Sequence, residues 1–305
     1  MGSGHSHGPG LASGSATGRY RWRLGLTFGL VASFFIVELL AGILSNSLSL
    51  ISDAGHMAAD VVALGAALVA TKIATRPDKS GRRSYGSYRA EVFASGLTVL
   101  IMLGVATYVV VEAFMRFGHN LEVQTSTMFI VGAIGLIINI VSLFLLRGGS
   151  KESLNVKGAY FEVVADAAGS VGVIVAGILV VATGSPIWDT LVAVAIGVFV
   201  AVRAVILGGQ VLAVLGQHVP EGVDLDTVVA ELESITGVGG IHDLHIWTLT
   251  SGMNVATAHL VVADAEQAPT ALSAAQEILR TRHKIEHATL QTEAAPTQQC
   301  HEVQW

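Results

Sequence analysis

The chain has 305 residues, of which 52% are hydrophobic and only 13% are charged, and its formal net charge is −6. This composition excludes an ordinary soluble protein and indicates a membrane protein. The single cysteine, Cys300, excludes an intrachain disulfide, so nothing implies an oxidising compartment.

The first 18 residues are polar and rich in Gly and Ser, and they predict a disordered N-terminal tail over 1–18. Six segments then reach the length of about 20 residues that a bilayer span requires. We therefore expect a polytopic α-helical membrane domain with six transmembrane helices over 19–210. The expected spans are roughly 24–44, 47–72, 91–115, 125–146, 158–183 and 187–209.

Basic residues are concentrated in alternate connections. Lys and Arg precede the first span and occupy 72–89 and 147–157, whereas the intervening turns carry almost none. Short loops rich in Lys and Arg stay on the cytoplasmic side. The pattern predicts a multi-pass protein of the cell (inner) membrane with both termini in the cytoplasm.

The second expected span carries ionisable side chains at Asp53, His56 and Asp60. Spacings of three and four residues place them on one face of a helix. Each ionisable group at the bilayer centre costs about 2.5–3.5 kcal/mol on insertion scales, so a neutralising partner is required. The fifth expected span supplies Glu162 and Asp166, again four residues apart. His56, Asp60, Glu162 and Asp166 together predict a four-ligand site for a divalent cation.

Two further polar residues fall inside expected spans, Glu38 in the first and Asn139 in the fourth. We expect both to face the interior of the helix bundle and to form hydrogen bonds there.

The region 211–305 differs in composition, because from Gly216 onward 12 Asp and Glu outnumber 3 Lys and Arg. Its patterns predict the order helix, strand, strand, helix, strand, typical of a small two-layer α+β domain. For any one of its histidines taken singly, a surface or edge position is favoured over a role as a metal ligand. His242 and His259 lie on adjacent expected strands and form a candidate metal site.

Three motifs resemble those of the cation diffusion facilitators, in particular their bacterial zinc–cadmium–cobalt resistance branch. They are SLSLISDAGHMAAD in the second span, YFEVVADAAGS in the fifth span and HDLHIWTLTSG in the C-terminal region. The resemblance covers about 20–295. It implies a ferredoxin-like cytoplasmic domain that binds metal and dimerises, hence a homodimer in the membrane.

The resemblance also implies roles for individual residues. The transport site of the family falls on His56, Asp60, Glu162 and Asp166, and Asp53 matches an outer-shell acidic position. In the cytoplasmic domain, His242, His259 and Glu293 match zinc ligands. His287 lies beside a further ligand position, where the alignment slips by one. A histidine-based site that some relatives carry between the second and third spans is missing, since 83–89 has no histidine.

The function implied is export of Zn²⁺, with Cd²⁺ and Co²⁺ as further substrates, in exchange for protons. Zn²⁺ is then both the transported substrate and a regulatory ligand of the cytoplasmic domain. The predicted ligand set with a bound divalent cation keeps one negative charge, which one proton neutralises. The expected partners are metal ions, protons and membrane lipid, and not nucleic acid.

Several alternatives stay open. His56 favours Zn²⁺, yet three oxygen ligands also suit Fe²⁺ or Mn²⁺, so an exporter of those ions is one alternative. A membrane metal sensor that does not transport is another. An intramembrane metalloenzyme is disfavoured, because the four ligands leave no open coordination position and no general base accompanies them. We therefore expect a transporter and not an enzyme.

Overall fold

The structure is a computed structural model that describes residues 16–74, 85, 87–116, 122–148, 154–250 and 252–294. Most of the expected tail, 1–15, lies outside the described residues, and the first helix begins at Ala16, within the range predicted as tail. The chain divides into two compact units. One comprises 1–69 and 94–208, and the other comprises 70–93 and 209–305.

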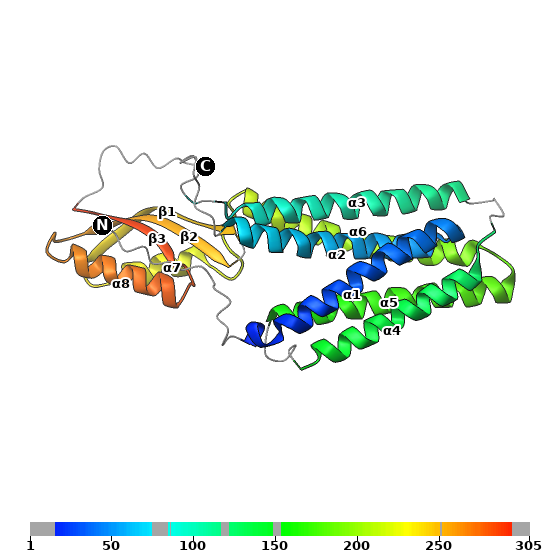
Figure 1. The fold of residues 1–305 in the computed structure, drawn as a ribbon. Coiled ribbons are helices and arrows are strands. Elements are labelled where there is room, and N and C mark those ends of the chain that lie inside the picture. Colours follow the sequence, from blue (N-terminus) through cyan, green and yellow to red (C-terminus); the bar gives the residue numbers. More distant parts are fainter. Residues whose placement is uncertain are drawn as a thin grey trace. The chain divides into compact units, whose positions relative to one another are not determined.

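The N-terminal two thirds of the chain is helical, as expected for a polytopic membrane domain (Figure 1). Five of the described helices are long and apolar enough to cross a membrane; α2, which carries Asp53, His56 and Asp60, is not among these five, and part of its side chains is not described. The helices are α1 (Ala16–Ser45), α2 (Leu48–Ala74), α3 (Ala90–Arg116), α4 (Thr125–Leu146), α5 (Leu154–Thr183) and α6 (Ile187–Leu215).

The core of the first unit forms where α1, α2, α4 and α5 meet. Phe34 of α1, Met57 of α2 and Val173 of α5 are among its fully buried side chains. Gly135 of α4 lies directly against Phe34, with no room for a side chain of its own. Small residues allow this close approach, which membrane helices use because lipid provides no hydrophobic drive for their association.

The N-terminus of α2 is capped by a side chain from another helix. Asp189, in the first turn of α6 and fully buried, accepts hydrogen bonds from the backbone N–H groups of Leu48 at 2.7 Å and Ser49 at 3.2 Å. The hydroxyls of Ser47 and Ser49 donate to the same carboxylate at 2.7 and 2.6 Å. The first N–H groups of a helix have no partner within it, so this contact satisfies them and ties α2 to α6.

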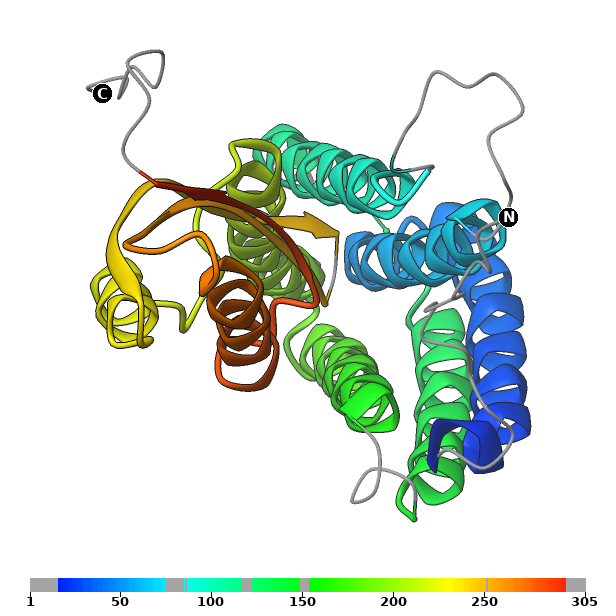
Figure 2. The same ribbon diagram turned by 90° about the vertical axis from the view of Figure 1, so that its left-hand side faces the viewer.

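The second unit contains an α+β domain with the predicted element order (Figure 2). Strand β1 pairs with β2 in antiparallel and β2 with β3 in parallel orientation. Both helices pack on one face of the sheet, where Leu232, Leu260 and Leu279 are fully buried. The elements are α7 (Leu225–Glu233), β1 (Val238–Thr250), β2 (Met253–Val262), α8 (Ala268–Thr281) and β3 (His287–Glu293).

Replacing Asp189 by Ala should destabilise the protein by about 2 kcal/mol or more, because several buried donors lose their acceptor at once. Thermal unfolding in detergent would measure the effect. Asp224→Ala is the matched control, because Asp224 caps α7 at the surface by accepting from the N–H of Thr227. Equal melting temperatures for the two variants would contradict the assigned role of Asp189.

Candidate metal sites

Three of the four predicted transport ligands lie together. His56 and Asp60 of α2 and Asp166 of α5 each offer one ligand atom, and these atoms lie within 4.8 Å of one another. His56 Nε2 is 3.8 Å from Asp60 Oδ2 and 3.7 Å from Asp166 Oδ1. The spacing of four residues on α2 places the first two side chains on one face, and the packing of α5 supplies the third.

Both carboxylate oxygens of this cluster lack a hydrogen-bond partner among the described residues. Asp60 Oδ2 and Asp166 Oδ1 are buried and form no hydrogen bond within the described part of the protein, and the same holds for His56 Nδ1. His56 is only 2% exposed and Asp166 only 3%. A buried polar atom without a partner costs about 1–3 kcal/mol, and more when it is charged. Asp60 Oδ2 and Asp166 Oδ1 are therefore available to a ligand from outside the protein.

Glu162, the fourth predicted ligand, is not part of this cluster. Its carboxylate accepts a hydrogen bond of 2.7 Å from Arg203 of α6, and its side chain is 42% exposed. Arg203 NH1 lies 3.3 Å from His56 Nε2, and NH2 lies 3.9 Å from Asp60 Oδ1. One guanidinium thus links Glu162 to the cluster.

Sequence reasoning missed Arg203. The signal was present, because an arginine inside the apolar helix α6 costs energy unless it is paired. Arg203 also corrects the predicted charge of the site. With Glu162 and the two aspartates ionised, the arginine leaves two negative charges rather than three, so a divalent cation brings the site to neutrality without an added proton.

Asp53, the predicted outer-shell residue, is buried one turn before His56. Its carboxylate lies against Gly169 of α5, where it occupies the space that a side chain would need. It is close enough to Glu38 of α1 for the two carboxyls to act on each other electrostatically. Glu38 is buried in the bundle interior as expected, but neither of its carboxylate oxygens accepts a hydrogen bond from a donor among the described residues.

A second cluster lies on the sheet of the α+β domain. His242 of β1 and His259 of β2 are directly opposite in the strand register, with ring centroids 5.0 Å apart. Glu293, the last residue of β3, reaches both: its Oε1 is 2.9 Å from His259 Nδ1 and its Oε2 is 3.4 Å from His242 Nε2. Leu260, the neighbour of His259 in β2, belongs to the core beneath the helices. Because side chains alternate along a strand, His259 lies on the opposite face of the sheet from α7 and α8.

His287 is placed away from this cluster. It begins β3, six residues before Glu293, which corresponds to about 20 Å along a strand. Asp243, which sequence reasoning did not single out, is nearer: its Oδ2 lies 4.0 Å from His259 Nε2. Its left-handed backbone, with φ of 55°, accompanies an irregularity in the β1–β2 register between His242 and His245.

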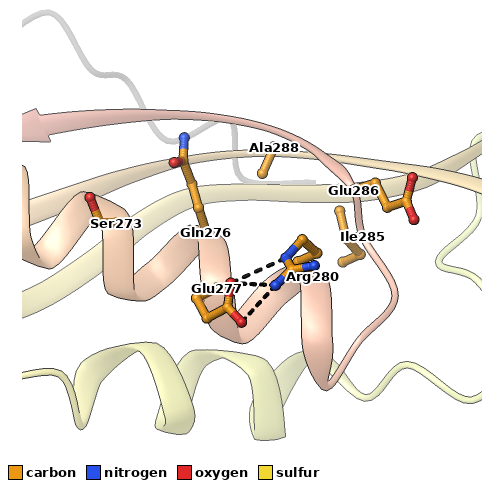
Figure 3. Close-up of a pocket in the computed structure, with 7 residues that line it drawn as sticks. All are labelled: Ser273, Gln276, Glu277, Arg280, Ile285, Glu286 and Ala288. Carbon is orange, nitrogen blue, oxygen red and sulfur yellow. Dashed lines mark hydrogen bonds and ion pairs between the residues drawn. The ribbon is translucent and has the colours of Figure 1, made fainter. Parts of the chain in front are cut away.

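An open pocket between α8 and the start of β3 contains none of the predicted ligands (Figure 3). The charged residues that line it include Glu277 and Arg280, which pair with each other at 2.8 Å. Their charges are mutually satisfied, so this pocket adds no candidate metal site.

Comparison with known proteins extends over both units. The chain matches the family model of the cation efflux transmembrane domain over 26–215 and that of the cation efflux protein cytoplasmic domain over 220–295. The metal cation efflux system protein CzcD of Cupriavidus metallidurans is 42% identical over 98% of this chain and 92% of that protein.

Two other relatives have names that state the metal ions concerned. The cadmium, cobalt and zinc/H(+)-K(+) antiporter of Bacillus velezensis is 34% identical over 97% of this chain and 93% of that protein. The zinc transporter ZitB of Escherichia coli is 33% identical over 92% of this chain and 88% of that protein. Among solved structures, the metal-bound C-terminal domain of the CzcD transporter is 37% identical over 23% of this chain and 99% of that chain, with a TM-score of 0.22.

Glu293→Gln should remove one bound Zn²⁺ per chain or weaken that site at least tenfold, because the side chain loses the charge that faces both histidines. Titration of the purified full-length protein against a chelator of known affinity would measure it. His287→Ala is the control from the same strand and should leave Zn²⁺ binding unchanged. Equal losses in both variants would contradict the three-residue cluster.

Proposed function

The chain belongs to the cation efflux family, the cation diffusion facilitators, and is a metal cation efflux transporter; on this premise we propose that it exports Zn²⁺ from the cytoplasm in exchange for protons. We include Cd²⁺ and Co²⁺ as further substrates. Relatives named for cadmium, cobalt, zinc and H⁺ support this choice.

The observation that supports the proposal is the spacing between His56 Nε2 and the unpartnered carboxylate oxygens of Asp60 and Asp166. Zn²⁺ binds imidazole nitrogen and carboxylate oxygen at about 2.0–2.2 Å, so the ligands of a tetrahedral site lie about 3.4 Å apart. The separations of 3.7 and 3.8 Å at His56 Nε2 are close to that value. Small side-chain movements would complete three corners of the tetrahedron.

Glu162 is our candidate for the fourth corner. It is held by Arg203, so binding a metal there requires exchanging the guanidinium for the ion. A guanidinium and a divalent cation compete for the same carboxylate, because both are attracted to its charge. Arg203 thereby acts as a built-in cation that occupies the ligands when the metal has left.

Exchange with protons follows from the chemistry of the ligands. Carboxylates and imidazole must be deprotonated to bind metal, so protons and metal compete for them. With Arg203 present, the empty site has two negative charges to balance, and protons can supply that balance. Metal enters where proton activity is low and leaves where protons are abundant.

Orientation and assembly are part of the same proposal. The basic loops favour cytoplasmic termini in the cell (inner) membrane. The match to the cytoplasmic domain of the family supports a homodimer. We infer that Zn²⁺ at His242, His259 and Glu293 regulates that dimer by neutralising part of its acidic surface.

The alternative of an Fe²⁺ or Mn²⁺ exporter differs in metal and not in architecture. Imidazole suits Zn²⁺ and Co²⁺ better than Mn²⁺, and His56 lies at the centre of the cluster. A sensor without transport would not need ligands buried between membrane helices, which is where Asp166 lies.

Replacing Asp60 or Asp166 by Ala should abolish metal transport, since each supplies one of three clustered ligand atoms. Uptake of Zn²⁺ into vesicles containing the purified protein, driven by a pH gradient, would measure it, with Cd²⁺, Co²⁺, Fe²⁺ and Mn²⁺ as competitors. Glu112→Ala is the control, because Glu112 pairs with Arg116 on α3 and not with the cluster. Transport retained in either aspartate variant would remove the site assignment, and a stronger competition by Mn²⁺ than by Co²⁺ would favour the alternative metal.

Arg203→Gln should bind Zn²⁺ at least tenfold more tightly, because the built-in competitor and its positive charge are removed. The same variant should transport more slowly, since release becomes harder. Chelator competition at pH 8, where protons compete least, would give the affinity. Arg203→Lys keeps the charge and should stay close to the unmodified protein; an unchanged affinity in Arg203→Gln would show that the guanidinium does not compete with metal.

A further inference from the structure

A second acidic pair is buried in the membrane unit outside the metal cluster. Glu38 of α1 is 0% exposed and Asp53 of α2 is 1% exposed. The Asp53 carboxylate lies against Gly169, so it points from α2 toward α5. The two carboxyls are close enough to act on each other electrostatically.

This pair needs a cation of its own. Both oxygens of Glu38 and Oδ1 of Asp53 receive no hydrogen bond from any donor in the described residues. Ionised carboxylates can only accept hydrogen bonds, so two of them can face each other only when a proton lies between them. Without it, two unpaired negative charges would be buried in the bundle, which is strongly unfavourable.

The surroundings provide no substitute for that proton. Among the ion pairs formed by described residues, none includes Glu38 or Asp53. The other charged group that acts on Glu38 is Asp166 of α5, which is also acidic. Helix α4 contributes Asn139, which is neutral, donates to Ser170 Oγ at 3.4 Å and leaves its own carbonyl oxygen without a partner.

We propose that Glu38 and Asp53 form a proton-binding site, separate from the metal ligands, that binds a counter-ion of transport. The proposal rests on the proton exchange proposed above and adds the place where one exchanged proton resides. Asp53 is one helical turn from His56, and Gly169 is one turn from Asp166. The pair therefore lies next to the metal cluster along both helices.

The coupling is electrostatic. When a divalent cation binds at His56, Asp60 and Asp166, its charge disfavours a second cation one turn away. The O–H bond of the shared carboxyl breaks, the proton passes to water, and the pair becomes ionised with the metal as its nearby counter-charge. When the metal leaves, the pair takes a proton again. Because Asp53 lies between His56 and the α1–α2 turn, the site is on the external side of the metal in the orientation proposed above.

The test counts protons released when Zn²⁺ binds to the full-length protein in weakly buffered detergent with a pH indicator. Glu38→Gln and Asp53→Asn should each release about one proton fewer per Zn²⁺ than the unmodified protein, because each keeps a neutral, permanently hydrogen-bonding group in the pair. Exchange of labelled for unlabelled Zn²⁺ across vesicles, without a pH gradient, should persist in Glu38→Gln. Glu112→Gln is the matched control and should release the normal number.

The outcomes separate the two proposals. If the unmodified protein released no proton, the proposal of proton exchange would be wrong. The proposal of this proton-binding site would then be wrong as well. If the unmodified protein released protons and both variants released the same number, only the assignment to Glu38 and Asp53 would fail. If the number of released protons changed when choline replaced K⁺ in the solution, the pair would be assigned to potassium. The assignment of a proton to the pair would then be overturned.

A measurement on the unmodified protein covers the case in which the variants do not fold. Infrared difference spectra should contain the carbonyl stretch of a protonated carboxylic acid without metal and lose it on addition of Zn²⁺. Absence of that band from the metal-free protein would overturn the proposal.

Discussion

Burial of ionised side chains among membrane helices, where no water can solvate them, is the constraint on which the rest of this structure depends. Asp166, Glu38 and Asp53 are all at most 3% exposed. Each must be neutralised by a cation, a proton or a guanidinium. A site whose neutralising partner can change is suited to transport, because the identity of the bound cation can then follow the concentrations on the two sides of the membrane.

Arg203 shows how the protein sets the number of exchangeable charges. Its guanidinium contacts Glu162 and lies near His56 and Asp60, so one positive charge is always available to these two acidic side chains. Only the negative charge that the guanidinium leaves unbalanced must be neutralised by a cation from outside the protein. Because that remainder matches the charge of a divalent metal, an arginine is compatible with the cation site that we propose.

The same reasoning gives the cytoplasmic cluster a different character. Glu293 already faces two histidines at 2.9 and 3.4 Å, and the cluster lies on the open face of a sheet in a domain with an acidic excess. A metal ion bound at this cluster would join three strands and would not need to leave, which is why we propose a regulatory ligand there rather than a substrate.

The sequence by itself determined the helical membrane domain, the α+β order and the candidate ligands, because hydrophobic length and residue spacing are local properties of the chain. Spacing placed His56 and Asp60 on one face, and the resemblance located Glu293 in the cytoplasmic site. Only the tertiary structure decided that Arg203 takes Glu162, that Asp189 caps α2 from another helix, and that Glu38 meets Asp53. These contacts join residues 15 to more than 100 positions apart. They depend on which helices pack together and on how each is rotated, and no local pattern encodes that.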